Sequence, residues 1–482
     1  MSTLKEAHKK KSLPKIFYFF SFFLWCILFF YGVLGYQGSP YVYTIFSFSY
    51  LALIISAFYI KVTYGYIFLA VMLWLGFWLK TTIHIIIMHP YIEPTGLFNF
   101  TASEWDNVLL LATIGAFGVI SGRIIYHLVA GKKSILITKS IHLYSSHYDR
   151  YKLWVWFAFA CTIIALALLN SIYSFQQIGL VPKTVVWPLN ALFSWMLSTG
   201  FSMTLATLLW WEISSSSTKN NMAYLILVEA AAASVSLLSR GLYVFHTIPI
   251  LLAITFNRQH ITNWNHKKTC VFLCSFFLVF LFCYPLVNSI RDYHYSSVPF
   301  DLPWNFYSSS IIEKGIIKLT MFSIDRWVGI EGLMATSTYP DKNTSLLLST
   351  ILEKGEIGKS SIFQDIALSH YRNMDLTKYT FASLPGPIAF FYFSGSKSVV
   401  FIGMCFMCCF VLASEVLVYK LLSNPILSAL WGSIVATSTT QIGVNVVNLI
   451  LYFILCLIGI LTLYIIQRYF FTSAPNNPIK TL

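Results

Sequence analysis

The chain has 482 residues, of which 57% are hydrophobic and only 10% are charged, and its formal net charge is +14 at pH 7. A soluble protein has roughly a quarter of its residues charged, so this composition excludes a soluble globular protein and indicates an all-α, polytopic integral membrane protein. The basic residues cluster in short loops beside apolar segments, which is a signal of membrane topology and gives no indication of nucleic-acid binding.

Apolar segments recur along the chain, and a helix needs about 20 such residues to cross a membrane. By this measure the sequence predicts about 12 transmembrane helices. Their ranges are 15–35, 40–60, 64–88, 105–128, 153–174, 186–211, 222–238, 241–256, 269–289, 386–421 (expected to be broken), 425–443 and 446–468. The predicted parts are an N-terminal bundle of about nine helices over 1–290, a large polar loop over 291–384, and C-terminal helices with a short tail over 385–482.

The distribution of lysine and arginine predicts the orientation of these helices. The N-terminus and the loops 129–152 and 257–268 are basic, whereas the loop 89–104 contains Glu93 and Glu104 and no basic residue. Cytoplasmic loops carry an excess of lysine and arginine. We therefore expect both termini in the cytoplasm and the large loop on the opposite side.

The large loop contains ten of the 18 acidic residues, and it is the first place to look for chemistry on a polar substrate. In the run from Asp325 to Gly332, Arg326 and Glu331 are charged groups in an otherwise apolar, aromatic setting, which favours a loop helix that dips toward the bilayer with its charges turned inward. A local ion pair between Asp325 and Arg326 is the alternative. Further on, His370 and Arg372 are either a base beside a hydrogen-bond donor to an anion or part of a solvated turn.

Arg240 interrupts two apolar segments, and the following Gly241 is expected to permit a tight reversal. Such an arginine either faces an anionic ligand or snorkels to the interface. The range 153–256 has no second arginine, which favours the ligand. Arg291, at the loop entrance, is either an interfacial anchor or a further hydrogen-bond donor to an anion.

Glu229, Lys80 and His84 are the ionisable residues inside predicted helices that we consider as candidates. Glu229 is surrounded by small residues and is expected to make an interhelical hydrogen bond, with a proton relay as the alternative. Lys80 and His84 form either a functional pair or the snorkelling end of a helix.

Several motifs are absent from the sequence. It has no Walker A sequence, no Gly-rich dinucleotide turn, no His-Glu-x-x-His and no Cys/His metal spacing. We therefore expect no nucleotide, metal or other cofactor. Clear inverted halves are also lacking, which weakens a secondary-transporter interpretation.

The Ser239-Arg240-Gly241 turn, the large late loop, and the re-entry at Pro385-Gly386-Pro387 followed by Phe390-Phe-Tyr-Phe-Ser-Gly395 together resemble the O-antigen polymerase (Wzy-like) family of oligosaccharide repeat unit polymerases. The resemblance implies a multi-pass glycosyltransferase of the bacterial inner membrane with a periplasmic site. Such an enzyme joins repeat units carried on undecaprenyl pyrophosphate into a surface polysaccharide, such as that of lipopolysaccharide, without metal. It also implies a chain-length regulator and a flippase of the same pathway as partners.

In this chemistry, arginines would stabilise the departing pyrophosphate and a base would accept the proton of the attacking sugar hydroxyl. The candidates for the pyrophosphate are Arg240, Arg326, Arg372 and Arg291, and those for the base are His370, Asp325 and Glu331. The alternatives are an O-antigen ligase-like glycosyltransferase, a polyprenyl-glycan flippase and a non-catalytic assembly partner.

Overall fold

A computed structural model describes residues 15–59, 63–130, 146–182, 188–214, 223–257, 264, 266–296, 323–443 and 445–471. Within these ranges the protein is helical, and its only bridge is an isolated antiparallel one between Leu180 and Tyr379. The N-terminal lysines before Lys15 and most of the two basic loops that predict the orientation lie outside the described residues.

The helices of the first part follow the predicted apolar segments. They are α1 (Lys15–Gly35), α2 (Pro40–Tyr59), α3 (Tyr64–Leu73), a π-helical turn (Trp74–Leu79), α4 (Lys80–Ile87), α5 (Ala102–Ala130), α6 (Ser146–Tyr173), α7 (Leu189–Trp195), a second π-helical turn (Met196–Gly200), α8 (Phe201–Ser214), α9 (Leu225–Ser236), α10 (Leu242–Phe256) and α11 (His266–Ser296). The π-helical turns join their neighbours into the continuous helical stretches Tyr64–Ile87 and Leu189–Ile213.

The last part contains short loop helices and then long apolar ones. They are α13 (Ile330–Thr338), α14 (Thr344–Leu352), α15 (Ile362–Ile366), a 3-10 turn (His370–Asn373), α16 (Pro387–Tyr392), α17 (Lys397–Leu422), α18 (Pro425–Thr440) and α19 (Val446–Phe470). The predicted break in 386–421 is confirmed, because α16 and α17 are separate helices. Gly386 has a φ of 76°, which favours glycine, and Pro387 occupies the first turn of α16.

Eight helices among the described residues are long and apolar enough to cross a membrane. Three shorter apolar helices, Phe19–Gly35, α9 and α10, accompany them. The chain is therefore a helical membrane protein with many candidate spanning helices, as its composition predicts. The count of 12 spanning helices stays a prediction.

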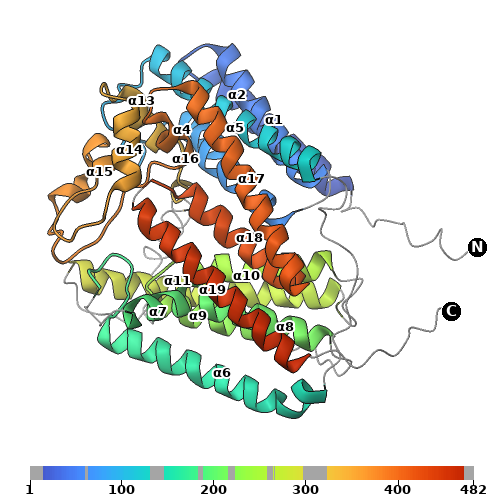
Figure 1. Cartoon of the computed structure of the whole chain (residues 1–482). Coiled ribbons are helices and arrows are strands. Elements are labelled where there is room, and N and C mark those ends of the chain that lie inside the picture. The colour runs from blue at the N-terminus through green and yellow to red at the C-terminus, as the bar shows by residue number, and fades with distance from the viewer. Residues whose placement is uncertain are drawn as a thin grey trace, which may run out of the picture.

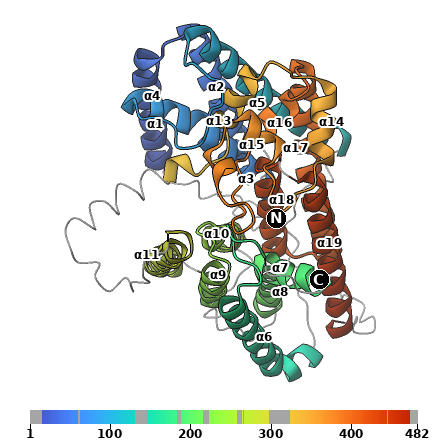
Figure 2. The ribbon, with the colours of Figure 1, turned by 90° about the vertical axis from the view of Figure 1, so that its left-hand side faces the viewer.

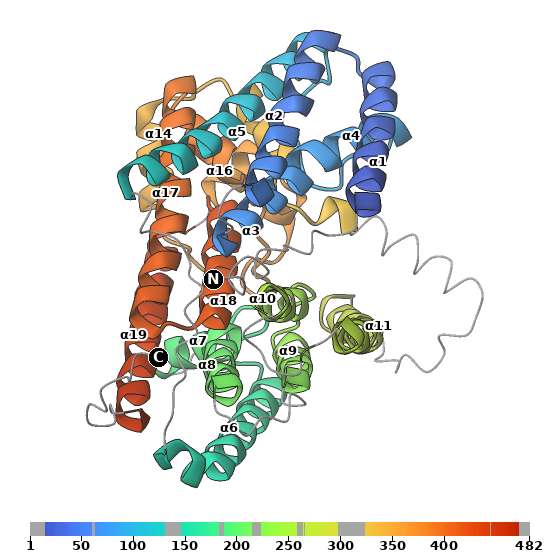
Figure 3. The same ribbon diagram turned by 90° about the vertical axis from the view of Figure 1, so that its right-hand side faces the viewer.

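The helices form two groups, which Figures 2 and 3 show one above the other. One group contains α1–α5 with α13, α16 and α17, and the other contains α6–α11. Helix α18 packs against both groups, because it contacts α3 and α17 on one side and α8 and α10 on the other. Figure 1 shows α13, α14, α15 and α16 gathered at one end of the long helices.

The described part of the polar loop is folded and partly buried. Ile330, Leu333 and Met334 of α13 are fully buried, and α13 packs against α5 and α16. Residues 297–322 lie outside the described ranges. The predicted loop entrance at 291 falls within α11, which continues to Ser296 and therefore carries Arg291 on a helix.

Candidate functional site: an arginine-lined cavity

A partly open cavity of about 820 Å³ is lined by residues of both helix groups. Polar connecting segments form much of its wall. They lie at 93–94, 176–182, 239–241, 323–332 and 380–384. Because consecutive spanning helices run in opposite directions, the predicted topology assigns all five segments to the non-cytoplasmic side. The structure brings these segments, distant in sequence, to one site.

Three of the four predicted arginines line this cavity: Arg240, Arg291 and Arg326. Arg326 has the accessible surface of an exposed residue because the cavity admits solvent, although protein atoms surround the side chain on most sides. This burial, together with the positive charges of Arg240 and Arg291, lowers the pKa of Arg326 to about 10. Arg326 therefore still carries positive charge near neutral pH, and a cavity lined by three arginines suits an anion.

The turn between α9 and α10 positions Arg240. The Ser239 amide donates to the Ser234 carbonyl at 2.9 Å, and Ser234 Oγ donates to the Ser239 carbonyl. The prediction that Gly241 makes the reversal possible is wrong in its detail. Gly241 has an ordinary φ of −89°, and the left-handed residue is Leu238, with a φ of 53°.

Arg291 reaches the same turn from α11. It is 9% exposed, and its Nη1 donates to the Leu238 carbonyl at 3.3 Å. Its guanidinium lies over the Tyr295 ring, 5.2 Å from the centroid. A buried side chain that holds the Arg240 turn is more than an interfacial anchor, so Arg291 belongs to the cavity wall.

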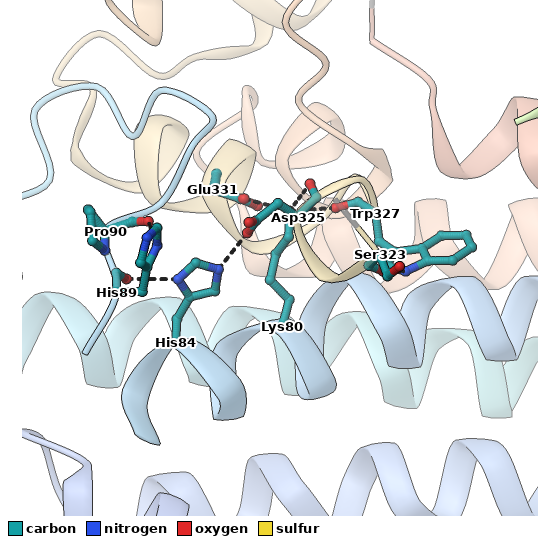
Figure 4. Close-up of polar contacts among 8 residues, drawn as sticks. All are labelled: Lys80, His84, His89, Pro90, Ser323, Asp325, Trp327 and Glu331. Atoms are coloured by element: carbon teal, nitrogen blue, oxygen red, sulfur yellow. Dashed lines mark hydrogen bonds and ion pairs between the residues drawn. The ribbon is translucent and has the colours of Figure 1, made fainter. Parts of the chain in front are cut away.

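Lys80 holds the segment that carries Arg326, as Figure 4 shows. It is 1% exposed. Its Nζ donates to the carbonyls of Asp325 (2.7 Å) and Trp327 (2.8 Å) and to Glu331 Oε1 (2.5 Å). These bonds use all three donors of the ammonium group. Arg326 stands between the two bound carbonyls, so Lys80 fixes the backbone on both sides of it.

The same segment packs closely on the π-helical turn below it. A Cβ added at Gly76 would lie 2.3 Å from the Val328 carbonyl oxygen, and one added at Gly329 would lie 2.3 Å from the Gly76 oxygen. Both positions require glycine because the two backbones touch. This contact and the hydrogen bonds of Lys80 together fix the position of the backbone that carries Arg326.

His84, one turn after Lys80, makes a second buried pair. Its Nε2 lies 2.6 Å from Asp325 Oδ1, and its Nδ1 lies 2.8 Å from the His89 carbonyl (Figure 4). Lys80 and His84 are both buried, so neither snorkels to an interface. The alternative of an ion pair between Asp325 and Arg326 gives way to this pairing of Asp325 with His84.

Asp325 and Glu331, two of the predicted bases, are buried and line the cavity, and Glu331 is turned inward as predicted. Each is already engaged, Asp325 with His84 and Glu331 with Lys80. Burial raises the pKa of Glu331, and the charge of Lys80 opposes that rise. Their contacts make these carboxylates positioning groups for the Arg326 segment.

The structure does not bring His370 and Arg372 to the arginines. Both lie in the exposed 3-10 turn, and neither lines the cavity. Tyr371, between them, points the other way and does line it. Of the seven candidate residues, five therefore meet at one cavity, and the predicted approach of Arg372 to Arg240 and Arg326 is not observed.

Aromatic and uncharged polar residues also line the cavity. Phe381 stacks on Tyr371 with ring centroids 5.2 Å apart and meets Tyr295 edge-on at 5.0 Å. The amide residues Gln176, Gln177 and Gln441 line the cavity as well. Gln177 is 6% exposed, and its Oε1 has no hydrogen-bond partner among the described residues. Aromatic faces and amide groups together suit a polar, uncharged ligand group such as a sugar.

Sequence reasoning missed several contributors to this site, among them Glu93 and Gln177. Glu93 lines the cavity, and it enters the topology prediction only as an acidic residue of a short loop. The available signal was its predicted position on the same side as the large loop. Nothing in the sequence distinguishes Gln177 from other polar loop residues.

The predicted interhelical contact of Glu229 is confirmed. Its carboxylate lies 3.2 Å from His246 Nδ1 across α9 and α10, and both side chains are buried. His246 Nε2 lies 2.8 Å from the Ser198 carbonyl. This pair joins three helices and lies outside the cavity lining.

Within the described ranges, no group of three or more His, Cys, Asp or Glu side chains is arranged to hold a metal ion. The fold and the cavity define a helical membrane protein with an arginine-lined cavity among its described residues. Comparisons with protein families, with curated proteins and with solved structures find no match to this chain.

Proposed function

We propose that this protein is an inner-membrane glycosyltransferase that polymerises oligosaccharide repeat units carried on undecaprenyl pyrophosphate, with its site on the periplasmic face. The observation that carries the proposal is the meeting of Arg240, Arg291 and Arg326 in one cavity. A lipid pyrophosphate is already an activated leaving group. Transfer of the glycan from it needs fixed positive charge where negative charge develops on the departing pyrophosphate, and it needs no nucleotide.

Two further features support a glycan carried by a lipid. The aromatic and amide wall beside the arginines suits sugar rings and hydroxyl groups. The cavity also extends between apolar residues of the helices, including Val244, Phe245 and Phe280, so its polar and apolar parts adjoin. A substrate with a sugar, a pyrophosphate and a prenyl chain likewise joins polar groups to an apolar one.

The direct test uses purified protein in detergent with repeat units linked to lipid pyrophosphate. Polymer should form without ATP and in the presence of a chelator. Absence of polymer from an intact preparation, or an absolute requirement for ATP, would contradict the proposal. An absolute need for a divalent ion would overturn its metal-independent form.

A deletion strain separates the related activities. A polymerase is indicated by loss of the long glycan with retention of the product capped by a single repeat unit. Loss of both products indicates a ligase or a flippase instead.

A further inference from the structure

The proposed transfer needs a proton acceptor beside the arginines, because the attacking group is a sugar hydroxyl. Three carboxylates line the described cavity, those of Glu93, Asp325 and Glu331, and no described histidine lines it. The acceptor must also be free to receive a proton from the substrate. The contacts of the three carboxylates therefore decide between them.

Asp325 and Glu331 are each held by a buried side chain of α4, Asp325 by His84 at 2.6 Å and Glu331 by Lys80 at 2.5 Å. Their side chains are 5% and 3% exposed, so little of either carboxylate faces the cavity. Glu93 differs in both respects. It is half-buried, and it makes no hydrogen bond or ion pair with any other residue that the structure describes. Its carboxylate is the one available to a ligand.

Several charged and titratable groups surround Glu93. They are Lys80 on α4, Asp325 and Arg326 in the segment before α13, Glu331 on α13, and Tyr371 in the 3-10 turn. Burial raises the pKa of Glu93, Asp325 adds to this rise, and Lys80 and Arg326 oppose it. The net result is a raised pKa, which makes this carboxylate a better proton acceptor than a solvated one.

We propose that Glu93 is the general base of the transfer, an inference that rests on the proposed function. The acceptor hydroxyl oxygen forms a bond to the anomeric carbon of the donor sugar. The bond from that carbon to the pyrophosphate oxygen breaks, and its electron pair leaves with the lipid pyrophosphate toward the arginines. The hydroxyl proton moves to the Glu93 carboxylate, which later releases it to water.

The test compares Glu93→Gln with the wild type in the purified system. The rate of polymer formation should fall by roughly 10²–10⁴-fold, the usual contribution of a general base. Binding of undecaprenyl pyrophosphate alone should stay equal or become tighter, because the substitution removes a negative charge from an arginine-lined cavity. Glu356→Gln is the matched control, since Glu356 is 58% exposed, forms an ion pair with Lys359 and with no other described residue, and does not line the cavity.

The pH profile gives a second readout that a merely structural role would not move. In the wild type the rate should rise with pH as Glu93 loses its proton, with a midpoint above that of an ordinary glutamate. Glu93→Asp should keep this rise of the rate with pH, at a lower overall rate, and Glu93→Gln should lose it.

The outcomes separate the two proposals. If the wild type makes no polymer from lipid-linked repeat units, the proposed function itself fails. If the wild type is active and Glu93→Gln polymerises at a near-normal rate, Glu93 only balances the charges of Lys80 and Arg326, and its role as base is refuted. Loss of both polymer formation and undecaprenyl pyrophosphate binding in Glu93→Gln would also refute it, because the residue would then serve the binding site.

Discussion

Replacement of Lys80 by methionine tests whether the buried lysine holds the Arg326 segment. The substitution keeps most of the apolar stem and removes a charge that donates to two carbonyls and to Glu331. Removal of one partner of a buried ion pair costs about 3–5 kcal/mol, because the other charge is left uncompensated. Glu331 can reduce this cost by taking up a proton, since burial already raises its pKa. We therefore expect a loss of about 3 kcal/mol in the free energy of unfolding.

The pH dependence of this loss has a definite sign. Without Lys80, the pKa of Glu331 in the folded state rises further above its value in the unfolded chain. The folded state then holds a proton that the unfolded chain releases, so the free energy of unfolding falls as the pH rises between these two pKa values. Lys80→Met should therefore be less stable at pH 8 than at pH 5, measured by unfolding in mixed micelles.

The double variant Lys80→Met/Glu331→Leu supplies the control. It leaves no unpaired buried charge, so it should recover at least about 1 kcal/mol relative to Lys80→Met alone. Lys80→Met and the double variant should both lose polymer formation, because neither has the lysine that binds the carbonyls on the two sides of Arg326. The reasoning is refuted if Lys80→Met lies within about 1 kcal/mol of the wild type, or if the effects of the two single substitutions simply add.

The other predictions concern the arginines and the orientation. Arg240→Lys should lose polymer formation almost as completely as Arg240→Ala, by roughly 10- to 150-fold for each charge-assisted hydrogen bond lost, because lysine lacks the planar fork; near-normal polymer from the lysine variant would exclude a bidentate contact. Arg372→Ala should keep near-normal activity, because Arg372 is exposed and does not line the cavity. Cysteines introduced at Ile135 and Asn263 should be protected from a membrane-impermeant thiol reagent in intact cells while Ser345→Cys is labelled, and the reverse pattern would overturn the orientation.

The positions of the long helices could be predicted because the bilayer imposes a length and an apolar composition on each. The segments 40–60 and 446–468, for example, agree with α2 and α19 to within two residues. Arg240 could be found for the same reason, since a charge between two apolar segments needs a specific explanation. These signals are local in sequence.

The pairings that build the site are not local, and the sequence could not supply them. Lys80 and Glu331 are 251 residues apart, and His84 and Asp325 are 241 apart. Within the polar loop, no apolar periodicity separates inward from outward residues. As a result Tyr371, which lines the cavity, could not be distinguished from its exposed neighbours His370 and Arg372.

The balance of charge in the cavity links the positioning network to the proposed chemistry. Among the described residues, four cationic side chains and three carboxylates line it, which gives a net charge of +1 when all are ionised. The carboxylates of Asp325 and Glu331 hold the segment and offset part of the repulsion among the arginines. When Glu93 accepts the proton of the sugar hydroxyl, the net charge becomes +2 in the same step in which the pyrophosphate gains negative charge. A carboxylate base beside the arginines would therefore strengthen the hold on the leaving group only as the transfer proceeds, which is the condition for lowering the barrier without binding the substrate more tightly.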